Sequence, residues 1–447
     1  MFRITKVEIQ GFWGKYKAAT NLYPDVNIFI GRNGSGKTTF MDLLQGVLRV
    51  DLRMLSSLDF ESITIGLKDK AKTQTITATK RDASDVPSQA IVFRVGSKPY
   101  TLPIDARDLY EDPYFRRHMR NARLEEEYNA LKKKIGELIN IASLSVHRAA
   151  YETAYEEEEY LPRRRTRRPP IEQRLEALVQ QLTSYQLTLA ERANQISSTF
   201  QRDVLASMLY DEKFDKFDPR DARGAELGKE KEDLSKAYGE LGALNKNVSE
   251  RIDKHIAALH RSLVALHEVE RQGSVGQAEG IENIEDRSEE TNRLLVDDIM
   301  PLPLLKRTQH IITLSLQAQN QKQVVFQPIN GFLQIVGEFI DDKEVKIDPN
   351  GDLTIQKDGK RIAIADLSSG EKQLLILLIE TLLQKNEPFV FLADEPELSL
   401  HIEWQAKIIS SIRNLNPHSQ IIVATHSPEI AGGWRENIID MEDVIHG

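Results

Sequence analysis

The sequence of 447 residues predicts an α/β fold whose parallel sheet is divided between the two ends of the chain, with a helical insertion between them. Three observations lead to this prediction. Short, wholly apolar runs typical of buried parallel strands occur near both ends. A glycine-rich turn separates the first of these runs from an amphipathic helix, and the middle of the chain carries apolar residues at spacings of three and four.

The N-terminal part is predicted to contain two kinds of β-structure. Residues 4–9 alternate apolar and polar side chains, residues 26–30 form an apolar run, and residues 37–49 have the spacing of an amphipathic helix. From 62 to 79 and from 90 to 102, threonine and β-branched residues alternate with polar ones. Such alternation is typical of an antiparallel sheet with one solvated face.

Three stretches in the middle carry seams of apolar residues at helical spacing, which predicts helices packed on other helices. Residues 210–227 are rich in Asp, Pro and Gly, so we expect the second and third helices to pair as an antiparallel hairpin. Its arms would have about 40 residues each, or about 60 Å. The three seams are Leu124, Tyr128, Leu131, Ile135 and Leu138; Ile171, Leu175, Leu178, Leu182, Tyr185 and Leu189; and Leu227, Leu241, Val248, Ile252, Ile256, Leu259 and Leu266.

After about residue 290 the chain is predicted to return to strand-like segments. Two turn signals, Pro-Asn-Gly and Lys-Asp-Gly, divide residues 345–367 into short β-rich runs, which predicts a small meander. An apolar helix at 374–383 follows, and the apolar runs 389–393 and 421–425 are expected to be buried parallel strands.

Composition excludes several classes of protein. The formal net charge of -9 argues against a protein that coats nucleic acid over its whole surface, so any such contact must be local. The absence of cysteine excludes disulfides, thiolate metal sites and cysteine nucleophiles, and it favours a reducing cytoplasm. The N-terminus has no apolar signal region, and the longest apolar run, 374–383, is too short to span a bilayer. We therefore expect a cytoplasmic protein with no membrane association.

The glycine-rich turn GRNGSGKT is a P-loop in the context that a P-loop requires, directly after a strand and before a helix. Its backbone N–H groups can surround phosphates, Lys37 can reach the β- and γ-phosphates, and the Thr38 hydroxyl can bind Mg²⁺. The sequence thus predicts ATP and Mg²⁺ as ligands. The predicted phosphate-binding residues are Gly31, Arg32, Asn33, Gly34, Ser35, Gly36, Lys37, Thr38 and Thr39.

Acidic and imidazole side chains follow the two C-terminal strands. Asp394 and Glu395 come directly after the run 389–393, where an acidic pair is often only a helix cap. Beside a P-loop, one carboxylate can complete the magnesium shell and the other can orient the attacking water. We assign Asp394 to the metal, with Thr38, and Glu395 to the water. His426 ends the next strand, at the edge where ligands of α/β sheets bind, and is predicted to sense the γ-phosphate.

The stretch LSSGEKQ at 367–373 has two interpretations. Ser368 followed by Glu371 fits a helix capping box before the apolar helix. The second interpretation comes from a family resemblance. The chain contains, in this order, the stretches GRNGSGKT, LSSGEKQ, VFLADEPE and ATHSP. With this ordered set it resembles the ABC ATPase superfamily, specifically the RecF, SMC and OLD-like branch. These stretches match its P-loop, signature, Walker B and switch-histidine motifs.

The resemblance implies a split ABC-type ATPase head, formed by a P-loop sheet and an antiparallel β subdomain, with an inserted helical, short coiled-coil hairpin domain. The N-terminal lobe would span residues 1–115, the insertion 116–300 and the C-terminal lobe 301–447. ATP would be hydrolysed slowly between two head-to-tail copies, because the signature of one copy meets the γ-phosphate held by the other. The signature residues are Ser368, Ser369, Gly370 and Glu371. The family's magnesium-contacting glutamine has no assigned residue here.

Three functions compete within this resemblance. A transporter motor is disfavoured, since about 330 residues separate the P-loop from the signature. A RecF- or SMC-like ATPase that acts on DNA in repair remains an alternative. The short hairpin and DEPELSLH are more similar to OLD-like anti-phage ATPases. Because the sequence ends about twenty residues past His426, a TOPRIM nuclease is expected to be a separate chain. This arrangement resembles the ATPase component of PARIS systems and, less closely, the Septu ATPase. The resemblance to PARIS systems implies a homo-oligomer of the ATPase that holds the nuclease.

One charged stretch allows two interpretations. Glutamates 156–159 precede five arginines, and the simpler interpretation is a solvated linker whose charges largely cancel. The other is a docking patch for DNA or for an acidic phage trigger protein, because arginine clusters bind such surfaces. The arginines are Arg163, Arg164, Arg165, Arg167 and Arg168.

Overall fold

The computed structural model describes residues 2–70, 72–81, 89–104, 122–145, 169–211, 226–279, 301–348 and 350–446. The chain divides into two compact units. We call Met1–Tyr185 with Pro328–Gly447 the head unit, and Gln186–Gln327 the arm unit. The five arginines of the charged stretch, and the residues around them from 146 to 168, lie outside the described residues.

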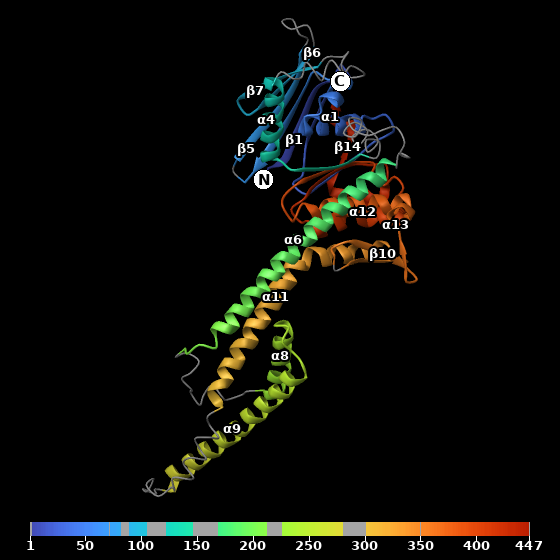
Figure 1. Cartoon of the computed structure of the whole chain (residues 1–447). Helices are drawn as coiled ribbons and strands as arrows, with labels where there is room; N and C mark the ends of the chain where they lie inside the picture. Colours follow the sequence, from blue (N-terminus) through green and yellow to red (C-terminus); the bar gives the residue numbers. More distant parts are fainter. Residues whose placement is uncertain are drawn as a thin grey trace. The chain divides into compact units, whose positions relative to one another are not determined.

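A five-stranded parallel sheet in the head unit is built from both ends of the chain (Figure 1). Its order is β14 (Ile438–Asp440), β3 (Val26–Ile30), β13 (Gln420–Ala424), β12 (Val390–Asp394) and β8 (Ile141–Ser145). All four neighbouring pairs are parallel. This confirms the predicted α/β fold with a divided sheet. Because the strands are parallel, the residues that follow β3, β12 and β13 gather at one edge.

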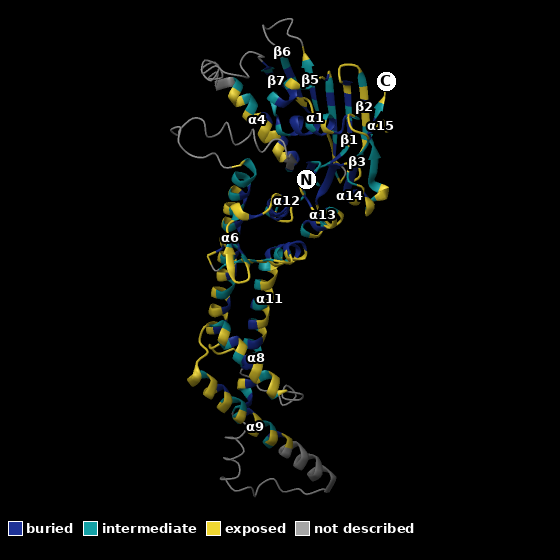
Figure 2. Ribbon diagram, turned by 90° about the vertical axis from the view of Figure 1, so that its right-hand side faces the viewer, coloured by how far each residue is buried: buried dark blue, intermediate teal, exposed yellow. Residues whose placement is uncertain are grey.

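A seven-stranded sheet forms the second layer of the head unit, and α1 (Lys37–Arg49) lies between the two sheets. Leu43 and Leu44 of α1 share one buried core with Ile9 and Leu392, which belong to the two different sheets. Figure 2 draws α1 mainly in the colour of buried residues. The pairs among β1, β2, β4, β5, β6 and β7 are all antiparallel, as predicted for this part of the chain. The strands, in spatial order, are β15 (Ile445–His446), β2 (Tyr16–Asn21), β1 (Arg3–Phe12), β4 (Ser62–Asp69), β5 (Lys72–Arg81), β6 (Gln89–Val95) and β7 (Lys98–Ile104).

The C-terminal part of the head unit contains the predicted meander and the apolar helix. The meander consists of β9 (Glu344–Ile347), β10 (Leu353–Lys357) and β11 (Lys360–Ile362), with antiparallel pairing throughout. Asp358 and Gly359 both have positive φ, as a two-residue hairpin turn requires. The helices that follow are α12 (Ser369–Leu383), α13 (Ile402–Leu415), α14 (Pro428–Gly432) and α15 (Met441–Val444).

Two elements from the stretch predicted as insertion pack in the head unit instead. The apolar seam of α4 (Ala122–Leu138) contacts β7 and α1 rather than another long helix, and Leu131 and Ile135 are buried in the inter-sheet core. β8 pairs with β12 in register from Ile141 to Ser145. The short helix α2 (Leu52–Ser57) packs beside α1 and β7.

The arm unit contains four helices among its described residues, and their pairing differs from the predicted hairpin. They are α6 (Pro170–Ala206), α8 (Leu227–Glu240), α9 (Lys246–Glu279) and α11 (Leu302–Phe339), of which α6 and α11 continue into the head unit. Phe200 and Val204 of α6 pack on Ala318 of α11, and the two helices lie side by side in Figures 1 and 2. The partner of α6 is therefore α11. The predicted third seam is divided after Leu241, where Gly242 adopts a positive φ.

The 38-residue helix α11 corrects the prediction of strand-like segments in this region. Two of its buried positions, Thr308 and Ser315, are polar, so the seam through Leu305 and Ile312 has no continuous apolar spacing. Thr308 is satisfied by hydrogen bonds to the carbonyl oxygen of Leu304 and to His255 of α9. None of the described helices combines the length and apolar character that crossing a membrane requires.

Candidate active site

The P-loop curls around the N-terminus of α1, and its glycines make this conformation possible. Gly34 and Gly36 have φ values of 78° and 93°, in the left-handed region that favours glycine. A Cβ atom on Gly36 would lie 2.9 Å from Cε1 of Phe12, so no larger residue fits there without displacing the ring. The first N–H groups of α1 therefore stand at the end of the loop, as in anion-binding helix termini.

Lys37 lies inside the loop, with only 5% of its surface exposed. Its Nζ donates hydrogen bonds to the carbonyl oxygens of Gly31 (2.9 Å) and Arg32 (3.1 Å). Burial lowers the pKa of Lys37, while the nearby carboxylates, Glu395 and Asp394 foremost, act in the opposite direction. The carboxylates thus favour the charged ammonium form of Lys37, which is the form that can bind a phosphate.

Asp394 ends β12 beside the first turn of α1. Burial raises the pKa of its carboxyl group, and a hydrogen bond with Thr38 opposes that rise. Its Oδ1 is buried and has no hydrogen-bond partner among the described residues. A hydroxyl and an unpartnered carboxylate oxygen are the kind of donors that Mg²⁺ takes from proteins, together with phosphate oxygens and waters. The donor set of Thr38 and Asp394 therefore fits Mg²⁺. No group of three or more His, Asp or Glu side chains suited to a metal occurs in the described part of the chain.

Glu395 and His426 face each other across the ends of β12 and β13. Nε2 of His426 lies 3.8 Å from Oε1 of Glu395, and about a third of each side chain is exposed. Glu395 has a φ of 50°, and its N–H donates to the carbonyl oxygen of Ala424 at 2.8 Å. A left-handed conformation in a non-glycine residue is costly and often marks a functional turn. Here it directs a carboxylate toward the histidine.

The predicted capping box is present at the start of α12. The side chain of Ser368 accepts from the N–H of Glu371, and the Glu371 carboxylate accepts from the N–H of Ser368. Gly370 lies against the loop after β12, since a Cβ atom there would be 2.4 Å from the carbonyl oxygen of Ser399. Among the described residues, no hydrogen bond or ion pair joins this turn to the P-loop of the same chain.

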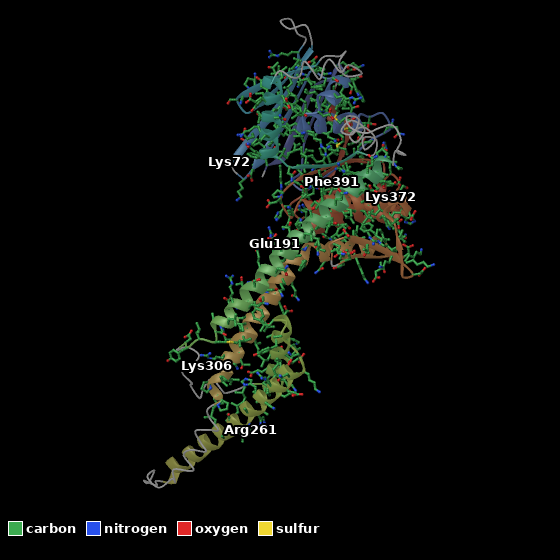
Figure 3. All side chains as sticks on the ribbon, viewed as in Figure 1. Lys72, Glu191, Arg261, Lys306, Lys372 and Phe391 are labelled. Carbon is green, nitrogen blue, oxygen red and sulfur yellow. The ribbon has the colours of Figure 1, made fainter. Side chains whose placement is uncertain are left out.

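Helix α12 is also tied to the beginning of α6 within the head unit. Lys372, which is labelled in Figure 3, donates to Glu172 of α6 at 2.7 Å and to the carbonyl oxygen of Ala365 at 2.8 Å. Two turns further along α12, Glu380 forms an ion pair with Arg174 of α6. Helix α12 is therefore held by charged contacts at both of these positions.

A family model described as "AAA ATPase domain" matches residues 2–431, which is nearly the whole chain. The chain belongs to the AAA ATPase domain family. Among the curated relatives that match, the following three do so over short segments. The Retron Vc95 probable ATPase of Vibrio cholerae serotype O1 biovar El Tor is 33% identical over 119 residues, 24% of this chain and 22% of its own length.

The Retron Ec83 probable ATPase of Escherichia coli is 36% identical over 90 residues, which are 18% of this chain and 17% of the relative. The Septu protein PtuA of Bacillus thuringiensis is 49% identical over 41 residues, 9% of this chain and 10% of the relative. The matched segments thus span less than a quarter of these relatives.

Among solved structures, two Smc head domains align with nearly all of this chain. The Smc head domain with an extended coiled coil from Pyrococcus furiosus, bound to the C-terminal domain of ScpA, is 14% identical and covers 98% of this chain and 93% of its own, with a TM-score of 0.42. The Smc head domain with a coiled coil and joint from Pyrococcus yayanosii is 16% identical and covers 98% and 95%, with a TM-score of 0.39.

In this AAA ATPase domain, Lys37, Thr38, Asp394, Glu395 and His426 gather at one edge of the parallel sheet. Ser368 to Glu371 begin α12, where Gly370 lies against Ser399 of the loop after β12. One further acidic residue of the site was not predicted. Glu397 accepts hydrogen bonds from the turn that carries the histidine. Its sequence signal is a third acid in DEPE, two positions after Glu395, but only the fold brings it to residues 425–427.

Proposed function

We propose that this chain hydrolyses ATP at a site completed by a second copy of itself. The observation that carries the proposal is the gathering of a P-loop lysine, a hydroxyl, an unpartnered buried carboxylate oxygen and a carboxylate–imidazole pair at one edge of the parallel sheet. Such an edge is where ligands of α/β sheets bind. Membership of the AAA ATPase domain family supports ATP as that ligand.

The residues of the chain divide the work between binding and reaction. Lys37 and the N–H groups of the P-loop bind the β- and γ-phosphates. Mg²⁺ held by Thr38 and Asp394 would neutralise charge on the phosphate oxygens. Glu395 orients the attacking water and accepts its proton, and His426 contacts the γ-phosphate from the next strand.

The signature turn supplies the part of the site that one copy lacks. Ser369 is exposed, and its N–H makes no hydrogen bond among the described residues. A helix N-terminus with free N–H groups and a hydroxyl is suited to bind phosphate. We therefore propose that Ser369 of one copy meets the γ-phosphate held by Lys37 of the other, in a head-to-tail pair.

For the biological role we propose anti-phage defence in the cytoplasm. The chain would act as a sensor and scaffold, in a homo-oligomer that controls a separate TOPRIM-type nuclease, as the resemblance to PARIS systems implies. The relatives named as retron ATPases and a Septu protein support a defence role. Purification with and without ATP, with a neighbouring nuclease co-expressed, tests this role. ATP-dependent binding of duplex DNA without nuclease capture would instead favour the alternative of an ATPase in DNA repair.

A mixing experiment tests the composite site. Lys37→Ala disables the P-loop and Ser369→Arg blocks the signature, so each variant alone should be inactive. In a mixed pair, the intact P-loop of one copy meets the intact signature of the other. Equal mixing should restore about a quarter of the parental sites, since half of the pairs are mixed and each has one intact site.

The matched control is Ser249→Arg. Ser249 is an exposed serine in the first turn of α9, in the arm unit, and this variant should hydrolyse ATP at the parental rate. Full activity of Ser369→Arg alone, or no recovery on mixing two folded variants that exchange subunits, contradicts the composite site.

A further inference from the structure

The carboxylate of Glu397 fixes the turn that carries His426. Its Oε1 accepts three hydrogen bonds, from the Thr425 hydroxyl at 2.6 Å, from the His426 N–H at 2.9 Å and from the Ser427 N–H at 3.2 Å. The Thr425 hydroxyl also accepts from the Ser427 N–H at 2.9 Å. One side chain on the loop after β12 thus binds three consecutive residues that follow β13.

The register of the parallel strands brings these two loops together. Asp394 is paired with Ala424, and the N–H of Glu395 extends the pairing by donating to the Ala424 carbonyl oxygen. The chain then turns back through the left-handed Glu395, with the Leu398 N–H donating to the Glu395 carbonyl oxygen. This turn carries Glu397 over the end of β13.

Helix α13 secures the same two loops from the other side. Gln405 accepts a hydrogen bond from the Ser427 hydroxyl at 2.7 Å through Oε1, and its Nε2 donates to the carbonyl oxygen of Leu400 at 3.0 Å. The hydroxyl of Ser427 also caps α14 by accepting from the N–H groups of Glu429 and Ile430. The backbone around His426 is therefore anchored on both flanks.

The imidazole of His426 depends on this anchoring for its position. About a third of the side chain is exposed, and its one polar side-chain contact among the described residues is the 3.8 Å approach to Glu395. A contact of that length does not fix an imidazole, because hydrogen bonds weaken steeply beyond their normal distance. The backbone, held by Glu397, has to set where the ring stands.

The second oxygen of Glu397 indicates that the carboxylate has a function beyond packing. Oε2 is buried and has no hydrogen-bond partner in the described part of the chain. A buried acceptor without a partner is costly and calls for an explanation, such as a catalytic role or a bound water or ion.

We propose that Glu397 is a positioning residue, which couples the loop of Glu395 to the turn of His426 and holds the imidazole against the γ-phosphate during hydrolysis. This inference rests on the proposed ATPase function. Its effect is geometric: the oxygen of Glu397 is needed as an acceptor for the turn, and the negative charge is not. The geometric role and an electrostatic role predict different behaviour for glutamine at this position.

The test compares Glu397→Ala with Glu397→Gln in the full chain, measuring kcat, KM and the Kd for ATP with Mg²⁺. We expect Glu397→Ala to lower kcat by about 10- to 100-fold, since misplacing a group by about an ångström can cost that much. The Kd should change by less than about threefold, because the P-loop contacts remain. Glutamine keeps an acceptor oxygen and should restore kcat to within about threefold of the parent. The control Glu429→Ala, an exposed acid two residues past Ser427, should match the parent.

A double-mutant cycle with His426→Ala shows whether Glu397 acts through the histidine. If it does, the double variant is no slower than His426→Ala alone, because a residue cannot position a side chain that has been removed. Three results would overturn the inference. They are losses in kcat that add in the double variant, a kcat of Glu397→Gln as low as that of Glu397→Ala, and a parental kcat in Glu397→Ala or His426→Ala.

Thr425→Val provides a second variant if Glu397→Ala does not fold, as judged by thermal melting. It removes only the hydroxyl that donates at 2.6 Å and should lower kcat by about three- to tenfold with little change in Kd. A parental kcat in this variant also counts against the inference. If the parental protein itself does not hydrolyse ATP, the proposed function fails, and with it the role of Glu397; parental turnover that Glu397→Ala leaves unchanged refutes the inference alone.

Discussion

Glu371 joins the cap of the signature helix to the meander strands, and its removal gives the sharpest stability prediction. Its Oε2 accepts from the N–H and the hydroxyl of Ser368, each at 2.8 Å, and its Oε1 forms an ion pair with Lys343. The exposed fractions of the paired side chains are 8% for Glu371 and 15% for Lys343. Glu371→Ala therefore removes half of a capping box and one partner of a nearly buried ion pair.

The expected cost follows from these contacts. Loss of a cap costs about 1 kcal/mol. Removal of one partner from a fully buried pair costs about 3–5 kcal/mol. Lys343 keeps Asp342 at 3.1 Å, which is half exposed, so we take about 2 kcal/mol for this pair. Glu371→Ala should thus lower the free energy of unfolding by about 3 kcal/mol, whereas Glu371→Gln, which can still accept from the cap, should lower it by about 2 kcal/mol.

Urea denaturation followed by tryptophan fluorescence measures these differences, with Trp404 close to the Gly370 backbone as a local reporter. The matched control is Glu344→Gln, whose exposed pair with Lys346 should contribute less than about 1 kcal/mol. A cost for Glu371→Ala no larger than for this control would refute the reasoning.

The pH dependence provides a second check on the same ion pair. Burial alone would raise the pKa of Glu371, but the hydrogen bonds from Lys343 and Ser368 outweigh it and hold the pKa below its usual value. A depressed pKa in the folded state means that the stabilisation is complete above the unfolded pKa and is lost as the pH falls through the folded one. The gap between parent and Glu371→Gln should therefore shrink below about pH 4. A gap that stays constant contradicts the ion pair.

Three further outcomes are expected in the head unit. Gly370→Ala should destabilise the protein by about 1–3 kcal/mol in urea, although alanine favours helices, because its Cβ would meet the Ser399 carbonyl oxygen. Asp394→Asn should stabilise the Mg²⁺-free protein at neutral pH, measured in EDTA; burial raises the pKa of Asp394, so its charge opposes folding above that pKa, and the gain should shrink as the pH falls. Glu395→Gln should retain the parental Kd for ATP and lose at least about 100-fold in kcat, and parental turnover would show that Glu395 is not the base.

Local sequence was sufficient for the elements whose signals lie within a few residues. The run 26–30, the helix 37–49 and the capping box at Ser368 appear in the structure as predicted. In each case the determining interaction, such as an N-cap bond or the burial of a continuous apolar run, is encoded in adjacent positions. The carboxyl ends of β3, β12 and β13 could likewise be placed at one edge once the strands were predicted to be parallel.

Elements determined by distant partners could not be predicted in this way. The strand β8 has no distinctive pattern of its own, and its place beside β12 depends on pairing with a segment about 250 residues away. The seam of α11 was missed because its buried positions Thr308 and Ser315 are polar, and Thr308 makes its hydrogen bonds within the arm unit. Glu397 was missed for the same reason, since its donors follow a different strand.

The two interpretations of LSSGEKQ concern different atoms, so they do not exclude each other. The hydroxyl and N–H of Ser368 are engaged by Glu371, which leaves the exposed Ser369, with its hydroxyl and its N–H, for a phosphate. Substitution at the two positions should therefore affect different properties. Glu371→Ala should lower stability, whereas Ser369→Arg should leave stability and ATP affinity unchanged and stop hydrolysis. Because a pure helix cap would tolerate arginine at the exposed position, loss of hydrolysis in a folded, ATP-binding Ser369→Arg protein would support the proposed contact with a second copy.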